Sequence, residues 1–480
     1  MLQRLLKVNV VYAAGSVANG AALFLLIPFL VKFLGPADFG LWSISEITIY
    51  FLTLVMMAGM DIYLMREYFF LKSESERKVL VGSMLGMAIV WGTGVIALFM
   101  LAVLLFSING RLFDQFNPAI LALIGAIGFC EVIFTLLLSI FRIQEKAFHF
   151  IFLSMGRMAM FMGAAIFWAK AGAGLSGALA GRLTATVVFI VIAWGMDRKY
   201  VQIGFSSKHL RPWANYGVPI LFSGLLFYIL ISADRYALQI MAGLQVVAIY
   251  SLSYKFAASV DILVTRPFAL DWAARRFSIA TGNHPEQEYA KAAILYAFIA
   301  LWCALLVQAG TPLLYDLFAS SLYIQGLNAL PVLLAANVIL GLSYPLNVGI
   351  MLKDRTKLLL PITAMAGISY ILALYFLIPH NPIQGAAWAT LMAYSVHTSG
   401  ITLVSLRLYP VKYPFQDWLL LGACSILAAA GLYLLNIDAS PWAEALARGL
   451  WISLIFTLTG YFFWKCRSVL ASAESTPSSK

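Results

Sequence analysis

Long apolar runs separated by short polar connections make up nearly the whole chain. Each run has about 20 residues or more, the length that a helix needs to cross the hydrocarbon layer of a membrane. The runs do not alternate apolar and polar residues at every second position, as strands of a membrane barrel do. The pattern therefore predicts fourteen membrane-spanning helices, at residues 8–33, 40–64, 79–107, 118–141, 148–169, 174–196, 214–241, 248–268, 291–315, 328–352, 358–379, 384–406, 417–436 and 446–464.

Composition supports a membrane protein that crosses the bilayer many times. Apolar residues make up 62% of the 480 residues and charged residues only 11%. A water-soluble chain of this length cannot bury so much apolar surface and still cover itself with charge. The first run follows Arg4 and Lys7, but it is too long for a signal peptide, so it is interpreted as a retained helix. The expected fold class is an all-α membrane protein.

The positions of the cations predict the orientation. With the N-terminus in the cytoplasm, 23 of the 32 Lys and Arg residues fall in cytoplasmic segments. Only Lys32 and Arg448, at the outer ends of the first and last spans, and Arg111 and Lys170, in outer segments, are counted on the outer side, so the positive-inside rule places both termini in the cytoplasm. Loop cations that face anionic lipid also account for the net charge of +11, and no nucleic-acid partner is expected.

Short sequence landmarks recur at a nearly constant offset and predict an internal repeat. "FLGPADFGLWSIS" (33–45) aligns with "MAGLQVVAIYSLS" (241–253) at an offset of 208. "LSGALAGRL" (175–183) aligns with "IQGAAWATL" (383–391) at the same offset, and "RIQEK" (142–146) with "KDRTK" (353–357) at 211. Six spans per half give both halves the same orientation, the parallel-repeat plan of several transporters. We expect a six-helix lobe at 1–210, a second at 211–412, two additional helices at 413–467 and a disordered tail at 468–480.

Ten charged residues interrupt the predicted spans. A charge at the centre of a span costs roughly 2.5–3.5 kcal/mol if it faces lipid, so these side chains must face protein or water. All ten lie in spans two to eight, and spans nine to thirteen carry only His397, which is interpreted as a hydrogen-bonded packing residue. The cations are Arg157, Arg182, Arg235, Lys255 and Arg266, and the acids are Glu46, Asp61, Glu131, Asp234 and Asp261.

Span eight concentrates polar residues on one face. At 100° per residue Ser251, Lys255, Ser259 and Arg266 fall within an arc of about 80°, which predicts a polar stripe. Cations at different depths suit a moving anion, because Lys and Arg both bind phosphate oxygens. The alternative is structural pairing of the five cations with the five acids. Asp61, Glu131 and Asp261 are candidates for binding a coupling cation, and a plain salt bridge remains the alternative for them.

Other chemistry is not indicated by the sequence. Cys130, Cys303, Cys424 and Cys466 show no paired spacing, so neither a disulfide framework nor a metal site is expected. The chain lacks a P-loop motif, and its predicted outer loops are too short to hold a polymerase active site. We expect no cofactor and no enzymatic activity.

The first hairpin and the middle of the chain resemble a known family. "FLGPADFGLWSIS" is similar to the first-hairpin signature of the Wzx-type polysaccharide transporters, the lipid-linked oligosaccharide flippases. The segment 216–257, with its "ADRY" and "YSLSYK" elements, is similar to the seventh and eighth helices of that family. The resemblance extends over all twelve repeat helices. It implies a MATE-like fold of two lobes.

The resemblance also implies a function. Members of this family move undecaprenyl-pyrophosphate-linked sugars from the inner to the outer leaflet of the bacterial cytoplasmic membrane, for O-antigen, capsule or exopolysaccharide synthesis. Their cationic central cavity implies substrate binding by Arg235, Lys255 and Arg266, with Asp234, Ser251 and Ser259 beside them. It also implies a role for Arg157 and Arg182, although no fixed motif surrounds these two. Membrane lipids, a polysaccharide polymerase and glycosyltransferases are the expected partners. A peptidoglycan-precursor flippase, a cation-coupled drug or metabolite antiporter, and a membrane-embedded polymerase or acyltransferase remain alternatives.

Overall fold

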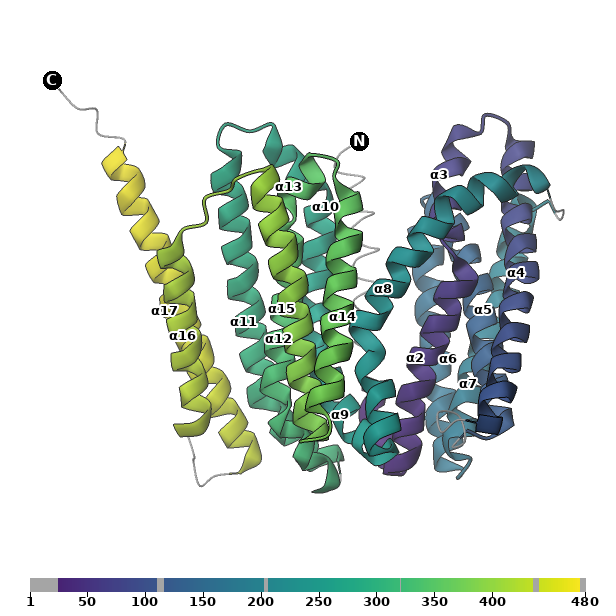
Figure 1. The fold of residues 1–480 in the computed structure, drawn as a ribbon, viewed down its shortest axis with the longest axis horizontal. Coiled ribbons are helices and arrows are strands. Elements are labelled where there is room, and N and C mark those ends of the chain that lie inside the picture. Colours follow the sequence, from purple (N-terminus) through teal and green to yellow (C-terminus); the bar gives the residue numbers. More distant parts are fainter. Residues whose placement is uncertain (1–24, 110–115, 203–205, 320, 435–439, 475–480) are drawn as a thin grey trace. The chain divides into compact units, whose positions relative to one another are not determined.

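The computed structural model describes all residues except 1–24, 110–115, 203–205, 320, 435–439 and 475–480. Within the described ranges the chain is helical and has no β-strand (Figure 1). Eleven stretches of the described residues form helices long and apolar enough to cross a membrane. The predicted all-α membrane fold is confirmed.

The first predicted lobe is built from long helices with short connections. α5 packs against α2 and α7, and α6 packs against α7. The helices are α2 (Pro36–Met57), α3 (Met60–Phe70), α4 (Glu74–Asn109), α5 (Pro118–Ile143), α6 (Ala147–Lys170) and α7 (Gly174–Asp197), followed by the 3₁₀ turns η1 (Arg198–Tyr200) and η2 (Ser207–His209).

The remainder of the chain follows the same pattern. Its helices are α8 (Leu210–Ala242), α9 (Leu244–Ala257), the π-helical turn η3 (Asp261–Thr265), α10 (Arg266–Ala280), α11 (Pro285–Phe318), the 3₁₀ segment η4 (Ser321–Asn328), α12 (Leu330–Leu346), α13 (Val348–Leu352), the 3₁₀ turn η5 (Thr356–Leu358), α14 (Leu359–Leu377), α15 (Pro382–Leu408), α16 (Phe415–Leu434) and α17 (Pro441–Glu474).

The predicted spans correspond to these helices from the second span onward. α15 and α17 occupy the positions of spans twelve and fourteen, although neither is among the eleven stretches named above. Of the first span only residues 25–33 are described, and they are helical. α17 extends past the predicted boundary at 467 to Glu474, and residues 475–480 lie outside the described ranges.

Helix starting points reproduce the predicted repeat. α2 begins at Pro36 and α9 at Leu244, and α7 begins at Gly174 and α15 at Pro382, so both pairs differ by 208 residues. The third landmark aligns at an offset of 209 rather than 211, because Glu145 and Asp354 occupy the same place in two matching turns. Their φ angles are 55° and 53°. The following amides, of Lys146 and Arg355, each bond a carbonyl five residues earlier, at 2.9 Å in both cases.

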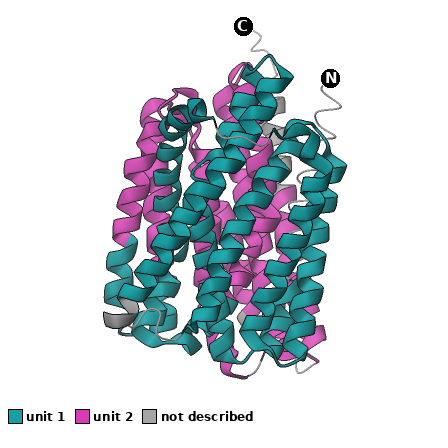
Figure 2. Cartoon of the chain, turned by 90° about the vertical axis from the view of Figure 1, so that its right-hand side faces the viewer, with its two compact units in different colours: residues 1–252, 370–386 teal, residues 253–369, 387–480 magenta. Residues whose placement is uncertain are grey.

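Contacts divide the chain into two compact units (Figure 2). Unit 1 holds residues 1–252 and 370–386, and unit 2 holds residues 253–369 and 387–480. α8, which opens the second predicted lobe, therefore packs with α2 and α3 in unit 1. The predicted boundaries of the repeat lobes stay a prediction, because a repeat in sequence and a compact unit in space are different divisions.

Three polar residues are buried in the apolar helix α2, and their hydroxyl groups bond to the backbone of the same helix. Ser43, Ser45 and Thr48 each donate to the carbonyl four residues earlier, at 3.1, 2.7 and 2.8 Å. A hydroxyl bonded to its own helix leaves no unpaired donor in the membrane. The three hydroxyl side chains can therefore be buried in α2.

Candidate functional site

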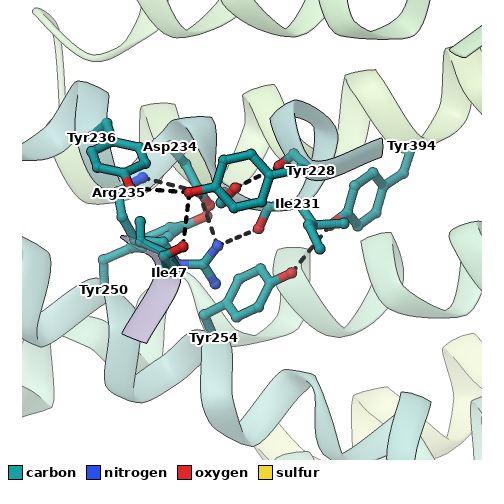
Figure 3. A network of polar contacts seen from close by, with 10 residues as sticks. Ile47, Tyr228, Ile231, Asp234, Arg235, Tyr236, Tyr250, Tyr254 and Tyr394 are labelled. Carbon is teal, nitrogen blue, oxygen red and sulfur yellow. Dashed lines mark hydrogen bonds and ion pairs between the residues drawn. The ribbon is translucent and has the colours of Figure 1, made fainter. Parts of the chain in front are cut away.

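A buried ion pair on α8 forms the centre of the candidate site (Figure 3). Asp234 is fully buried and Arg235 is 6% exposed. The Arg235 Nη1 donates to Asp234 Oδ1 at 3.1 Å and also to the Ile231 carbonyl. The second carboxylate oxygen, Asp234 Oδ2, accepts from the Tyr250 hydroxyl at 2.6 Å. Asp234 and Arg235 both lie within α8, as the predicted span at 214–241 requires.

Tyrosines connect this part of α8 to α2. The Tyr236 hydroxyl lies 2.9 Å from Thr48 Oγ1 and 3.0 Å from the Tyr228 hydroxyl. Tyr228 in turn donates to the Ile47 carbonyl at 3.0 Å. This chain of hydrogen bonds ties α8 to the α2 backbone within unit 1, next to the ion pair along the helix (Figure 3). The guanidinium itself is positioned by Asp234 and the Ile231 carbonyl, and Asp234 is in turn bonded to Tyr250.

The local geometry explains why Asp234 and Arg235 tolerate burial. The carboxylate accepts three hydrogen bonds, because the Arg235 amide also donates to Oδ1, at 2.9 Å. A buried pair recovers its desolvation cost only when hydrogen bonds satisfy the remaining polar atoms. The pair is close to neutral, so its attraction for a distant anion is small. Arg235 is best suited to directional contact at short range.

A second buried cluster lies among α5, α6 and α7. Arg157 Nη1 donates to Glu131 Oε1 at 2.6 Å, and Arg182 Nη2 donates to the same oxygen at 3.2 Å. The side chains of the two arginines are about one-fifth exposed, and that of Glu131 is 12% exposed. Because one carboxylate serves two guanidiniums, the cluster keeps a net charge of +1. Glu131, a predicted candidate for binding a coupling cation, is already paired with cations.

A π turn within span eight changes the direction of Arg266, the last residue of the predicted polar stripe. The turn η3 separates Ser259 from Arg266, so 100° per residue no longer applies beyond it. The Arg266 side chain is 61% exposed and its Nε donates to Asp261 Oδ2 at 2.7 Å. Lys255 is half-buried on α9, and Ser259 Oγ donates to the Phe256 carbonyl at 2.6 Å. The 80° arc predicted for four residues holds only for a regular helix and does not reach Arg266.

Three other residues that the sequence singled out share no hydrogen bond or ion pair with these groups among the described residues. Ser251 is 2% exposed, and its hydroxyl has no hydrogen-bond partner among the described residues. Asp61 lies half-buried in the first turn of α3 and forms no ion pair within the described ranges. His397 Nε2 lies 3.3 Å from Thr363 Oγ1, as expected for a packing residue.

Comparison with protein families decides the family of the chain. The profile described as "Polysaccharide biosynthesis protein" matches residues 5–269, more than half of the sequence. The chain belongs to the polysaccharide biosynthesis protein family. The match extends across all ten embedded charges, from Glu46 to Arg266. The resemblance to Wzx-type transporters is confirmed at the level of the family.

Solved structures show the same fold as this family member. A lipid II flippase, MurJ, in an inward closed conformation aligns with a TM-score of 0.70 at 16% identity, over 94% of this chain and 97% of that one. An inward-facing multidrug resistance MATE family transporter aligns at 0.63 and 16%, over 83% and 98%. A Vibrio cholerae MATE transporter variant aligns at 0.57 and 15%, over 84% and 96%. No curated protein sequence matches significantly. The predicted MATE-like fold is confirmed, and the structures it resembles are transporters and flippases.

The tyrosines of the α8 network were missed by the sequence reasoning. Tyr228 and Tyr236 are eight residues apart and flank the charged pair, which places them on one helix face. Tyr250 occupies the repeat position of Trp42. The sequence signal that could have found these residues is a tyrosine at helical spacing from an embedded charge.

One cavity of about 140 Å³ lies in unit 2, and none of the predicted site residues lines it. Its walls are mainly apolar side chains of α11, α12 and α16, with Gln308 and Ser425 as the polar members. The cavity therefore supplies no cationic site. The cationic central cavity that the family resemblance implies stays a prediction.

Proposed function

We propose that this family member is a flippase that moves undecaprenyl-pyrophosphate-linked oligosaccharides from the inner to the outer leaflet of the bacterial cytoplasmic membrane. The observation that carries the proposal is the family match to residues 5–269, because that segment holds every embedded cation. A pyrophosphate headgroup is an anion that must cross a layer from which charge is excluded. Fixed cations within the spans lower that cost.

Burial distinguishes the proposed roles of these cations. Exposed ion pairs contribute little net stability, so the Arg266–Asp261 pair can open toward a phosphate at small cost. Lys255, on the same span, supplies a point charge. Arg235 is held by Asp234, so it offers a preorganised contact. Arg157 and Arg182 add the net positive charge of their cluster, and Ser251 and Ser259 add hydroxyls for the sugars.

The membrane potential is the proposed source of energy. Two negative charges that leave a cell which is negative inside gain on the order of 4–5 kcal/mol at 100 mV. A coupling ion is therefore optional. Glu131 and Asp261 are already paired with arginine, and Asp61 remains the proposed residue for binding a coupling cation. Both termini are proposed to be cytoplasmic, and a polymerase and glycosyltransferases are the proposed partners.

The test is complementation of a strain that lacks the gene. Arg235→Ala, and separately the pair Lys255→Ala with Arg266→Ala, are expressed at matched protein levels. Loss of one charge-assisted hydrogen bond is expected to lower surface polysaccharide roughly tenfold or more. The control is Arg275→Ala, which removes only an exposed pair with Asp271 on α10. Polymer output equal to wild type in both test strains would exclude these residues from transport.

A lipid II flippase is the second candidate function. The alignment with MurJ over 94% of this chain favours it. The two candidates predict different cargo in cells that lack the protein. Accumulation of a lipid-linked sugar repeat unit on the inner leaflet supports the first, and accumulation of the peptidoglycan precursor supports the second. A drug or metabolite antiporter is supported less well, because Glu131, Asp234 and Asp261 are all bonded to arginine.

A further inference from the structure

The second membrane span is broken near one end. α2 stops at Met57 and α3 starts at Met60, although the two form one apolar stretch of 35 residues. Between them Ala58 and Gly59 have φ angles of 40° and 70°. The break lies about 33 Å from Pro36, at the end of the span that the cation distribution assigns to the cytoplasm. A left-handed alanine in a buried helix needs support from its surroundings.

Two tryptophans supply that support. The last carbonyls of a helix have no partner inside the helix, and water cannot satisfy them in a membrane. Trp91 Nε1, on α4, donates to the Val55 carbonyl at 2.9 Å. Trp213 Nε1, on α8, donates to the Ala58 carbonyl at 3.0 Å. The two indoles also contact each other edge to face, with ring centroids 6.4 Å apart.

The break lies against a second weak point, on α8. A side chain at Gly217 would overlap the Ala58 carbonyl oxygen, and one at Gly59 would lie 3.0 Å from the Gly217 Cα. Two residues later Pro219 removes one backbone hydrogen bond from α8. Proline and glycine are the usual sites of helix kinks. The weak points of two neighbouring helices are therefore in direct backbone contact.

Aromatic contacts join the segments beyond these weak points. Tyr63 on α3 and Tyr216 on α8 have ring centroids 6.3 Å apart. The Arg66 guanidinium lies 4.9 Å from the centroid of the Tyr216 ring. α3 and the first turns of α8 therefore form one packed pair of short segments.

The other repeat is irregular at the same place. An offset of 208 equates Ala58 with Arg266, the first residue after the π turn. There Thr265 Oγ1 lies 2.8 Å from the Tyr296 hydroxyl, so a side chain again supports the interrupted segment. The two repeats have different residues at this point. The helix is therefore irregular at the same place in both repeats without a shared sequence motif.

We propose that the Ala58–Gly59 break and the Gly217–Pro219 segment form a paired hinge, about which α3 and the start of α8 move as one body. This body has two positions, and Trp91 and Trp213 stabilise one of them, because in that position their N–H groups bond the carbonyls at the break. We call these two residues the tryptophan pins. Hinges of this kind absorb a change in φ and ψ at a few residues and leave the packed helices intact. The hinge does not depend on the identity of the transported molecule.

The experiment measures the two positions directly in the full-length protein in lipid nanodiscs. Spin labels replace Phe69 on α3 and Phe148 on α6, both more than two-thirds exposed and both in unit 1. Pulsed EPR gives the distribution of distances between the labels. Trp213→Phe and Trp91→Phe each remove one N–H and keep an aromatic ring. Loss of one hydrogen bond is expected to change the ratio of the two positions roughly threefold to tenfold.

Controls and outcomes separate a hinge from a packing effect. Trp194→Phe on α7 changes an exposed tryptophan away from the break and is expected to leave the distribution unchanged. If Trp213→Phe gives no folded protein, Trp91→Phe tests the hydrogen bonds at the same break. Trp91 is 42% exposed, so its replacement disturbs the packing less. The same single narrow distance in wild type and in every folded Trp→Phe variant at the break would overturn the hinge.

Discussion

The Cα of Gly40 lies so close to the carbonyl oxygen of Leu244 that a side chain at residue 40 would overlap it. Gly40 belongs to the first repeated turn, and Leu244 is the first residue of α9 in the second. The two copies of the turn thus pack directly against each other inside unit 1. The repeat position of Gly40 is Ala248, so glycine is required in only one copy.

Gly40→Ala is expected to lower stability by about 1–3 kcal/mol, because the new methyl group displaces backbone and not a flexible side chain. Thermal unfolding of the purified protein in detergent measures the effect. Gly35→Ala is the matched control, since a side chain there meets no atom within 4 Å. Equal unfolding temperatures for the two variants would contradict the close contact.

Glu131→Gln is expected to destabilise the protein by about 3–5 kcal/mol, because it leaves two buried guanidiniums without a counter-charge. The yield of monodisperse protein in size-exclusion chromatography reports the loss. Adding Arg182→Gln to Glu131→Gln should restore part of the yield, since one cation then remains. A double variant that is worse than the single variant would disprove the shared-carboxylate interpretation.

Tyr250→Phe removes the hydrogen bond to Asp234 Oδ2 and is expected to cost about 1.5–3 kcal/mol, the range for a bond to a charged group. Tyr375→Phe, at a position that is 66% exposed, should have little effect. Thermal unfolding compares the two. A Tyr250→Phe protein as stable as the control would show that the hydroxyl does not support the ion pair.

Asp354→Gly is expected to raise stability by about 1 kcal/mol, because an exposed residue with a positive φ angle carries strain that glycine does not. Glu145→Gly should act in the same direction at the matching turn. Lys353→Gly, one position earlier with an ordinary negative φ angle, should lower stability instead. Unfolding temperatures that fall in all three variants would argue against strain at these turns.

The sequence predicted elements better than it predicted side-chain geometry. Hydrophobic runs located the helices because apolar length is a local property that the membrane imposes directly. The repeat was found because residues at its turns, such as Gly35 and Gly243, lie at a fixed spacing. The π turn was missed, and with it the position of Arg266, because a register shift leaves no mark in the hydrophobic pattern.

The sequence alone does not show which embedded charges pair with each other. Asp234 and Arg235 are neighbours in sequence, so their pairing is one case of the alternative in which embedded cations pair with embedded acids. Glu131 lies 26 residues from Arg157 and 51 from Arg182, so only the packing of α5, α6 and α7 shows that they share one oxygen. The tryptophan pins are similar, because Trp213 and Ala58 are 155 residues apart.

The sequence by itself determined that this chain is a helical membrane protein with duplicated halves and embedded charge, because each of these features follows from residue type and spacing alone. The tertiary structure decided which charges neutralise each other, where the helices break, and that α8 packs with the first lobe. Those outcomes depend on distances between residues far apart in the chain, and in a membrane they are constrained by the high cost of leaving a buried polar group without a partner.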